Sequence, residues 1–278
     1  PSIARVVDLG HAEVPTGGDV KLAGSDGKAI AGELLFIEGR NFGRGPAVSI
    51  GGQPAVAAAR TENGGILVRV PTGVPEGRQG VVVSTHKGVA SFNLEFLRFG
   101  AAAVPGTKRI SLLQAPDYKE IASIETPAEI AALEFSAIRP LLYAVTLTPD
   151  DCRAHASRPE CTPELLTIEL TLPGFPITQR QKLVPGTVLR FSTARFVSRA
   201  VVATSGGMQV INLEYRNPIV HHRMNWKSAD VLEAAISPDG RSVLVLLRDN
   251  RLLAYDISLP DLPKKGPELS LLPEEKAP

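Results

Sequence analysis

The sequence has few cysteines, few aromatic residues and no long apolar run. Among its 278 residues are two Cys, one Trp, nine Phe and four Tyr. No apolar block exceeds the five residues of Val243–Leu247, whereas a membrane-spanning helix needs about 20, so no transmembrane segment is expected. The 44% of hydrophobic residues nevertheless suffices for a core and excludes wholesale disorder. The length fits two domains, at about 150 residues per domain.

Neither sign of charge dominates. Thirty Lys and Arg stand against 29 Asp and Glu, for a formal charge of +1. Residues 1–98 hold ten basic and nine acidic side chains, and the rest of the chain holds twenty of each. This balance gives no support to a nucleic-acid or polybasic membrane partner, since both need a surplus of positive charge.

The sequence also lacks the motifs of common active sites. It has no Gly-x-Ser-x-Gly, His-Glu-x-x-His, Walker loop or calcium loop. The adjacent His221 and His222 would point to opposite faces of a strand and could not easily share a metal. Asp239 and Asp256 are expected to fix turns rather than to transfer protons. We therefore predict a non-enzymatic protein without a metal or cofactor.

The two cysteines lie close together in the sequence. Cys152 and Cys161 lie nine positions apart and bracket a polar stretch, which fits a local disulfide in an oxidising compartment, with a pair of reduced thiols as the alternative. Such a bond would pin a loop rather than hold the fold. The chain begins at Pro1 without Met, so a mature or trimmed product is expected. The expected disulfide favours a location in the periplasm, at the outer membrane surface or outside the cell.

Glycine is unevenly distributed: 17 of the 25 glycines fall in residues 1–98. Short runs in which apolar residues alternate, such as Ile66 to Val70 and Val81 to Thr85, are separated there by glycine turns. Period-two alternation with turns every 8–12 residues is typical of an antiparallel sandwich. The sequence therefore predicts one all-β domain over residues 1–98.

Four ordered segments of this region resemble IPT/TIG domains. They are Leu34–Gly43 (LLFIEGRNFG), Val48–Ala55 (VSIGGQPA), Ile66–Gly73 (ILVRVPTG) and Gly80–Thr85 (GVVVST). The resemblance implies an immunoglobulin-like sandwich that acts as a spacer or binding module, without catalysis. Residues 19–33 stand where the family has only a few residues, so an extra hairpin or loop is expected there.

The rest of the chain, residues 99–262, contains a repeat. Three similar strand patterns begin at Ile130, Val188 and Val231, with spacings of 58 and 43 residues. The first spacing exceeds the second by 15 residues, which matches an insertion near residues 150–164 that carries the cysteines. A period near 43, with several short strands per unit, indicates propeller blades, and the third unit resembles a WD40/YVTN-type blade. An unrelated β-sandwich with coincidental spacing is the alternative.

The all-apolar Val243–Leu247 is expected to be an inner strand covered on both faces. Residues 99–262 have room for about three and a half blades, whereas propellers have about four to eight. We therefore expect either a longer polypeptide or another subunit that covers the open ends. Residues 263–278, rich in proline and charge, are predicted to form a flexible tail.

These features predict a non-enzymatic binding or scaffold protein of the cell surface or periplasm. Its partner would be another protein or further copies of itself. Candidate contact residues are Arg40, Phe42 and Arg44 on a turn, and Met224 and Trp226 in a later segment; packing against a neighbouring strand is the alternative for each. A carbohydrate-binding accessory region of a secreted hydrolase would instead show exposed coplanar aromatics. A self-assembling subunit would be completed by neighbouring chains.

Overall fold

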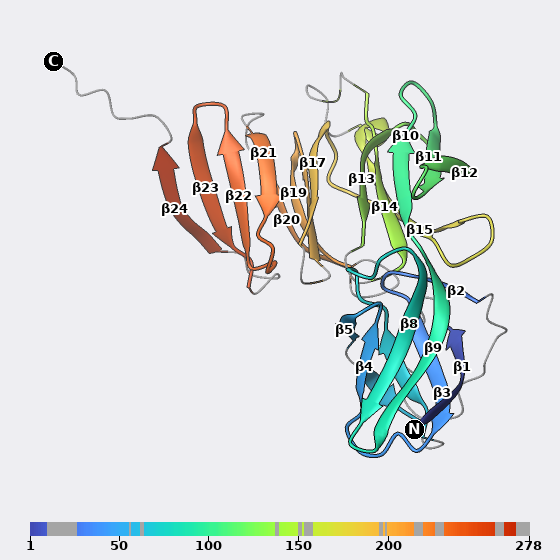
Figure 1. Cartoon of the computed structure of the whole chain (residues 1–278). Helices are drawn as coiled ribbons and strands as arrows, with labels where there is room; N and C mark the ends of the chain where they lie inside the picture. Colours follow the sequence, from blue (N-terminus) through green and yellow to red (C-terminus); the bar gives the residue numbers. More distant parts are fainter. Residues whose placement is uncertain are drawn as a thin grey trace.

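Antiparallel β-strands make up nearly all the regular structure of the chain. The computed structural model describes residues 1–9, 27–55, 57–61, 64–136, 139–149, 152, 158–194, 197, 199–213, 219–225, 231–258 and 264–270. Of residues 57, 58, 159, 219–225, 267 and 270 it describes the backbone alone. Helical structure in these ranges is limited to 3₁₀ geometry, at Cys152 and in the turn η2 (Pro159–Cys161). Figure 1 shows a sandwich that hangs below one end of a row of sheets. The all-β prediction is confirmed.

Two sheets form the sandwich. The first has the order β1 (Ser2–Asp8), β3 (Leu34–Arg40), β7 (Ile66–Arg69) and β6 (Ala57–Arg60). The second has the order β2 (Lys28–Ile30), β9 (Gly88–Leu97), β8 (Gly77–Thr85), β4 (Ala47–Ile50) and β5 (Gln53–Ala55). All neighbours are antiparallel except β2, which runs parallel to β9. The segment predicted to add a hairpin or loop thus supplies strand β2, while residues 10–26 lie outside the described ranges.

The core of the sandwich follows the alternation in the sequence. Leu35 and Ile37 of β3 face Val81 and Val83 of β8 in one buried cluster, and all four side chains are 0% exposed. Each strand contributes every second residue to this core because successive side chains point to opposite faces. The sandwich that the sequence predicts over residues 1–98 is therefore present.

Four further sheets follow along the chain. The first has three strands, β10 (Phe99–Ala103), β11 (Arg109–Gln114) and β12 (Lys119–Glu125). The second contains β13 (Ile130–Phe135), β14 (Leu141–Thr146), β15 (Glu164–Glu169) and β16 (Ile177–Lys182). The third contains β17 (Val188–Thr193), β18 (Arg199–Thr204), β19 (Gly207–Asn212) and β20 (Ile219–Asn225). The fourth contains β21 (Val231–Ile236), β22 (Ser242–Leu247), β23 (Arg251–Asp256) and β24 (Lys264–Ser270).

The three four-stranded sheets repeat one another in detail. Their first strands begin at Ile130, Val188 and Val231, the positions at which the sequence places the repeats. Each first strand carries a bulge at the same place, directly after its first residue. The first strands of successive sheets also contact one another and follow in a row across Figure 1. Four-stranded sheets arranged in this way are the blades of a β-propeller.

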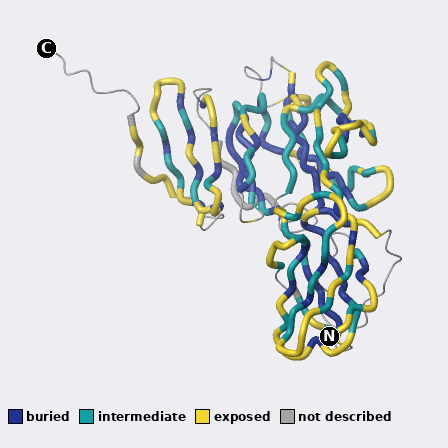
Figure 2. Tube along the Cα trace, viewed as in Figure 1, coloured by how far each residue is buried: buried dark blue, intermediate teal, exposed yellow. Residues whose placement is uncertain are grey.

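The sheets stack through alternate side chains of their strands. In β14, Tyr143 packs toward the third sheet, whereas Leu142 packs toward the first. In β18, Val202 packs toward the second sheet and Val201 toward the fourth. Both strands are therefore buried on both faces, and Figure 2 shows them in dark blue.

The last sheet departs from two expectations. The run Val243–Leu247, expected to be covered on both faces, is covered on one: Val245 is 0% exposed but Leu244 is 45% exposed, because no described element lies beyond the sheet. The first part of the predicted flexible tail is instead a strand, because β24 (Lys264–Ser270) pairs antiparallel with β23. An edge position tolerates Pro267, and Glu268 forms ion pairs with Arg251 and Lys265 there. Residues 271–278 lie outside the described ranges.

The sandwich and the blades are joined without a linker. Strand β9 ends at Leu97 and β10 begins at Phe99, so the predicted boundary after residue 98 falls between them. Ile30 of β2 belongs to the core cluster between the first two blades. Gly32, with φ of +82°, packs so tightly that a Cβ would lie 2.6 Å from the backbone of Arg139. These contacts fix the sandwich against the blade array.

Candidate functional site

The outer face of the fourth blade is an uncovered apolar surface that the strand register defines. Directly paired residues share a face of a sheet. Leu244 pairs with Ala235 and Ala254, and Leu246 with Leu252, which pairs in turn with Leu269. We call these six residues the open face: Ala235, Leu244, Leu246, Leu252, Ala254 and Leu269. Leu244 is 45% and Leu269 56% exposed.

Within the array, the equivalent faces are buried. In β18, the residues on the side of the fourth blade are covered by Val243, Val245 and Leu247 of β22. The open face has the same kind of composition, aliphatic side chains interspersed with alanine, so it is built to receive another apolar surface.

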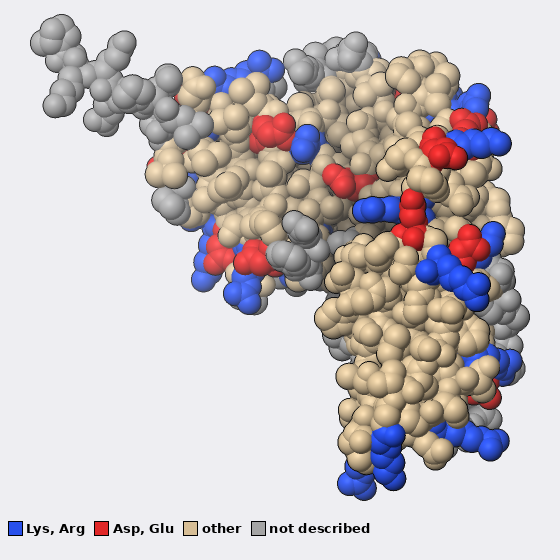
Figure 3. Space-filling model, viewed as in Figure 1, with Lys and Arg blue, Asp and Glu red and all other residues tan. Residues whose placement is uncertain are grey.

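The opposite end of the array has a different outer face. Arg109 of β11 donates from Nε to Ser123 Oγ at 2.8 Å and forms ion pairs with Glu120 and Glu125 at 3.8 and 3.9 Å. Charged side chains of both signs gather over β10–β12 in Figure 3. A polar outer face is typical of the terminal repeat that caps a stack. The array is thus capped at one end and apolar at the other.

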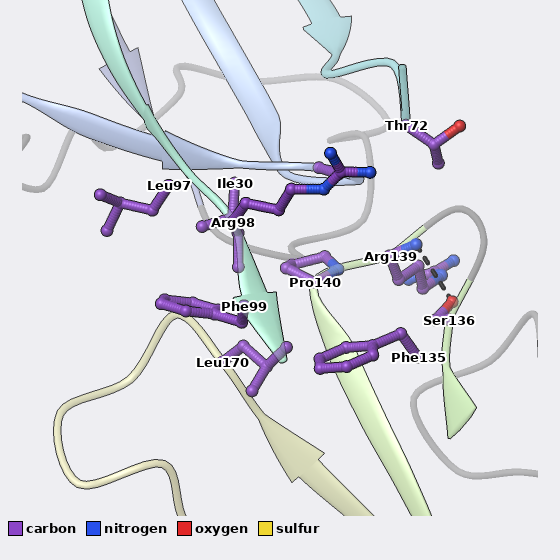
Figure 4. A pocket seen from close by; sticks show the side chains of 11 residues that line it. Ile30, Thr72, Leu97, Arg98, Phe99, Phe135, Ser136, Arg139, Pro140 and Leu170 are labelled. Carbon is purple, nitrogen blue, oxygen red and sulfur yellow. Dashed lines mark hydrogen bonds between the residues drawn. The ribbon is translucent and has the colours of Figure 1, made fainter. Parts of the chain in front are cut away.

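A pocket of about 410 Å³ lies where the sandwich meets the first two blades. Figure 4 shows Phe99, Phe135 and Leu170 on one side of it and Arg98 and Thr72 on the other. A second hollow of about 330 Å³ shares Ile30, Leu97, Phe99 and Leu170 with it. The lining of the larger pocket contains no His, Cys or carboxylate, so it does not bring a nucleophile next to a base.

Burial dominates the ionisation of the groups near this junction. Burial raises the pKa of Tyr143 to about 12. Burial, and then the positive charge of Arg139, lower the pKa of Arg69. Both shifts follow from packing between the domains and blades, since desolvation disfavours the charged form.

The predicted disulfide is present. The sulfur atoms of Cys152 and Cys161 are bonded at 2.07 Å, and both residues are 0% exposed. The carbonyl of Cys161 accepts a hydrogen bond from Gly186 N at 2.7 Å, and Thr148 Oγ1 donates to Gly186 O. The bond therefore pins the loop between β14 and β15 onto the connection between β16 and β17.

The other predicted contact residues are placed differently. Arg40 and Arg44 are exposed at the turn after β3. Phe42 is 3% exposed in the sandwich core, so its prediction as a contact residue is wrong: the turn folds back over Gly39, where a Cβ would overlap the ring. Met224 lies in β20 with its side chain outside the description, and Trp226 lies outside the described residues.

The acidic residues that the sequence assigns to turns do fix them. Asp239 accepts hydrogen bonds from Ser237 Oγ at 2.6 Å and Arg241 N at 3.1 Å, and Asp256 accepts one from Ser258 N at 2.8 Å. The hydrogen bonds from Ser237 Oγ and Arg241 N lower the pKa of Asp239, and hydrogen bonds from the side chain and then the backbone of Ser258 lower the pKa of Asp256. Across the described ranges, no three His, Cys, Asp or Glu residues are grouped to hold a metal ion.

Two further observations concern membranes and carbohydrates. None of the described helical segments has the length and apolarity to cross a membrane. Tyr118 is the one exposed aromatic residue whose side chain the structure describes, so the described surface holds no coplanar exposed pair of the kind that the carbohydrate-binding alternative predicts.

Comparisons with known proteins match one part of the chain by sequence and the other by shape. Residues 24–97 match the IPT/TIG domain family, while the comparison with curated proteins gave no significant match. Among solved structures, the β-propeller domain of Cps50 (Swd1) from Myceliophteria thermophila is 12% identical with a TM-score of 0.43, covering 69% of this chain and 68% of that one. Hsv2 from Kluyveromyces lactis is 10% identical with a TM-score of 0.34, covering 66% and 71%.

The strand order and the family match agree on the first domain. The rest of the chain is assigned to propeller blades by the register of its strands, by the repeated bulges and by the stacking of its sheets. Residues 24–97 are an IPT/TIG domain, and an incomplete β-propeller of one three-stranded and three four-stranded sheets follows it.

Proposed function

We propose that this chain is a non-enzymatic scaffold that binds another protein through the open face of its fourth blade. The observation that carries the proposal is the contrast between the two ends of the array. Arg109 and its glutamate partners cap one end, whereas leucines that are 45% and 56% exposed form the other. An uncovered apolar sheet face of this kind marks an interaction site.

A second copy of the chain is the occupant that this contrast favours. Head-to-tail contact would press the open face against Arg109, Glu120 and Glu125, and would remove these charges from water at a high cost. Contact between two open faces buries mostly aliphatic side chains, with the charged Glu233, Asp256 and Lys264 in register only at the ends of the face. A symmetric pairing also closes on itself as a dimer, whereas a head-to-tail contact continues into a larger ring or a fibre.

The size of the open face sets the expected strength of this pairing. Four strands about 4.8 Å apart, each with six residues rising about 3.4 Å, give a face of about 400 Å². A standard interface buries about 800 Å² per partner. We therefore expect a weak dimer, with a dissociation constant of roughly 10–100 µM.

The proposed location is extracytoplasmic: the periplasm, the outer membrane surface or the exterior of the cell. The support is the disulfide between Cys152 and Cys161, because such bonds persist in oxidising compartments. Thiol labelling of protein taken from its native compartment without reductant tests this. Two unreactive cysteines are expected, and two freely labelled thiols would remove the argument for this location.

Sedimentation velocity on a pair of matched variants tests the binding surface. Leu244→Glu places a carboxylate on the open face, and we expect it to abolish association. Leu147→Glu is the control, because Leu147 is 44% exposed, almost the same as Leu244, but lies in the loop after β14. Association that survives Leu244→Glu, or is lost equally in both variants, would sink the proposal. If the open face is instead covered by a further blade of a longer polypeptide, the isolated chain is expected to stay monomeric, and pairing of two copies is refuted.

A further inference from the structure

We propose that the turn between β3 and β4 of the IPT/TIG domain, together with Arg40 and Arg60, binds a phosphate group. A hollow of about 530 Å³ lies at this turn, lined by Gly39 to Gly43, Arg60, Thr61 and Gly64. It is separate from the open face, so this inference does not depend on the proposed scaffold function.

The backbone of the turn alternates in a way that favours anions. Asn41, Gly43 and Gly45 have φ values of +61°, +65° and +63°, whereas Phe42 and Arg44 between them have no positive φ. In a turn, residues whose φ alternates in sign can present successive N–H groups toward one side and so form an anion-binding nest. Residues 41–45 donate no backbone hydrogen bond to another described residue, so these N–H groups are available.

Two guanidinium groups line the same hollow. Arg40 ends β3 and Arg60 ends β6, and both are exposed. Among the described residues no carboxylate lines the hollow, and none forms an ion pair with either arginine. Glu62 and Asn63 lie outside the description. Thr61 Oγ1 accepts a hydrogen bond from Gly65 N at 3.0 Å, which leaves its own proton to donate.

The donor set matches a phosphate better than a carboxylate. A phosphate monoester carries about 1.5–2 negative charges and three strong acceptor oxygens, which can engage two guanidinium groups and several N–H groups at once. A carboxylate offers one charge in one plane and would leave some donors without a partner.

The position of the hollow makes it accessible to a large phosphate-bearing partner. Arg40 pairs in register with Ser2, and Figure 1 places the N-terminus at the end of the sandwich remote from the blades. The Lys and Arg side chains at this lower end are visible in Figure 3. A phosphate on a surface or on a free molecule can therefore approach without meeting the propeller.

Titration of the full chain with inorganic phosphate, followed by amide chemical shifts, tests the inference. Saturable shifts are expected at residues 40–45 and at Arg60, Thr61 and Gly64. Arg40→Gln and Arg60→Gln should each weaken binding about tenfold, the factor carried by one charge-assisted hydrogen bond. Arg78→Gln is the matched control, since Arg78 is exposed on β8 of the same domain but does not line the hollow. Absence of shifts at the turn, or equal weakening in the control, would overturn the proposal.

Vesicle sedimentation separates the two sources of phosphate. Binding to phosphatidic acid vesicles, whose headgroup is a phosphate monoester, but not to phosphatidylcholine vesicles, lost in Arg60→Gln, assigns the site to a lipid headgroup. Phosphate shifts without vesicle binding assign it to a soluble phosphate. If neither phosphate-induced shifts nor vesicle binding is observed, the inference is overturned. Circular dichroism verifies that each variant is folded.

Discussion

Alanine substitutions at Val245 and Leu244 separate the two faces of β22. Val245 is 0% exposed and packs on the third blade, whereas its neighbour Leu244 lies on the open face and is 45% exposed. The two residues share one strand and differ chiefly in what covers them. We expect the smaller side chain to be the costlier one to truncate.

The magnitudes follow from burial. Val245→Ala removes two buried carbon atoms at about 0.8 kcal/mol each and leaves a cavity between two blades, which together cost about 2–3 kcal/mol. Leu244→Ala removes three carbon atoms, but the side chain is only about half buried and the site is open, so no enclosed cavity forms. The cost to the isolated chain is then about 1 kcal/mol.

Urea unfolding at about 1 µM, where a weak dimer is dissociated, measures both variants. Fluorescence of Trp226, the one tryptophan of the chain, follows the segment between β20 and β21. A larger loss of unfolding free energy for Val245→Ala is the expected result. Equal losses, or a larger loss for Leu244→Ala, would refute the assignment of the covered and open faces.

Three further predictions concern single contacts. The folded pKa of Tyr143, about 12, exceeds the ordinary value of 10.0, so the folded state binds more protons between these pH values. The unfolding free energy, measured by urea unfolding, is therefore expected to fall by about 3 kcal/mol more in the unmodified chain than in Tyr143→Phe as pH rises from 10 to 12. Serine at both Cys152 and Cys161 lowers the unfolding free energy by about 2–3 kcal/mol, and reductant then has no further effect in the same urea assay. Gly32→Ala, whose Cβ would lie 2.6 Å from backbone, lowers the thermal midpoint more than the control Gly27→Ala, which has a similar φ and no atom within 4 Å; equal shifts would contradict the tight domain junction.

The repeat could be predicted from the sequence because each blade strand carries its own signal. The starts at Ile130, Val188 and Val231 are set by local alternation, which depends on the pleat and not on distant contacts. The strands of the IPT/TIG domain could be predicted in the same way, since glycine marks the turns between them. The close spacing of Cys152 and Cys161 favours a disulfide, but the sequence alone also allows a pair of reduced thiols.

The remaining features depend on tertiary contacts. An apolar run such as Val243–Leu247 does not reveal whether a sheet follows on its second side. Phe42 looks like a turn residue in the sequence, and its burial follows from the fold of the turn over Gly39. Lys264 to Ser270 contains residues with poor strand propensity, and pairing with β23 overrides that propensity. Asn41, Gly43 and Gly45 are residue types that favour a positive φ, but the sequence does not show that their turn lies beside Arg60.

Sedimentation equilibrium of the unmodified chain tests the central claim most directly. With concentration raised from about 1 to about 500 µM, across the expected dissociation constant, the mass should rise from 29.6 kDa toward twice that value. A mass that stays at 29.6 kDa throughout would contradict pairing through the open face. A mass that grows beyond twice this value would contradict a symmetric, closed pairing.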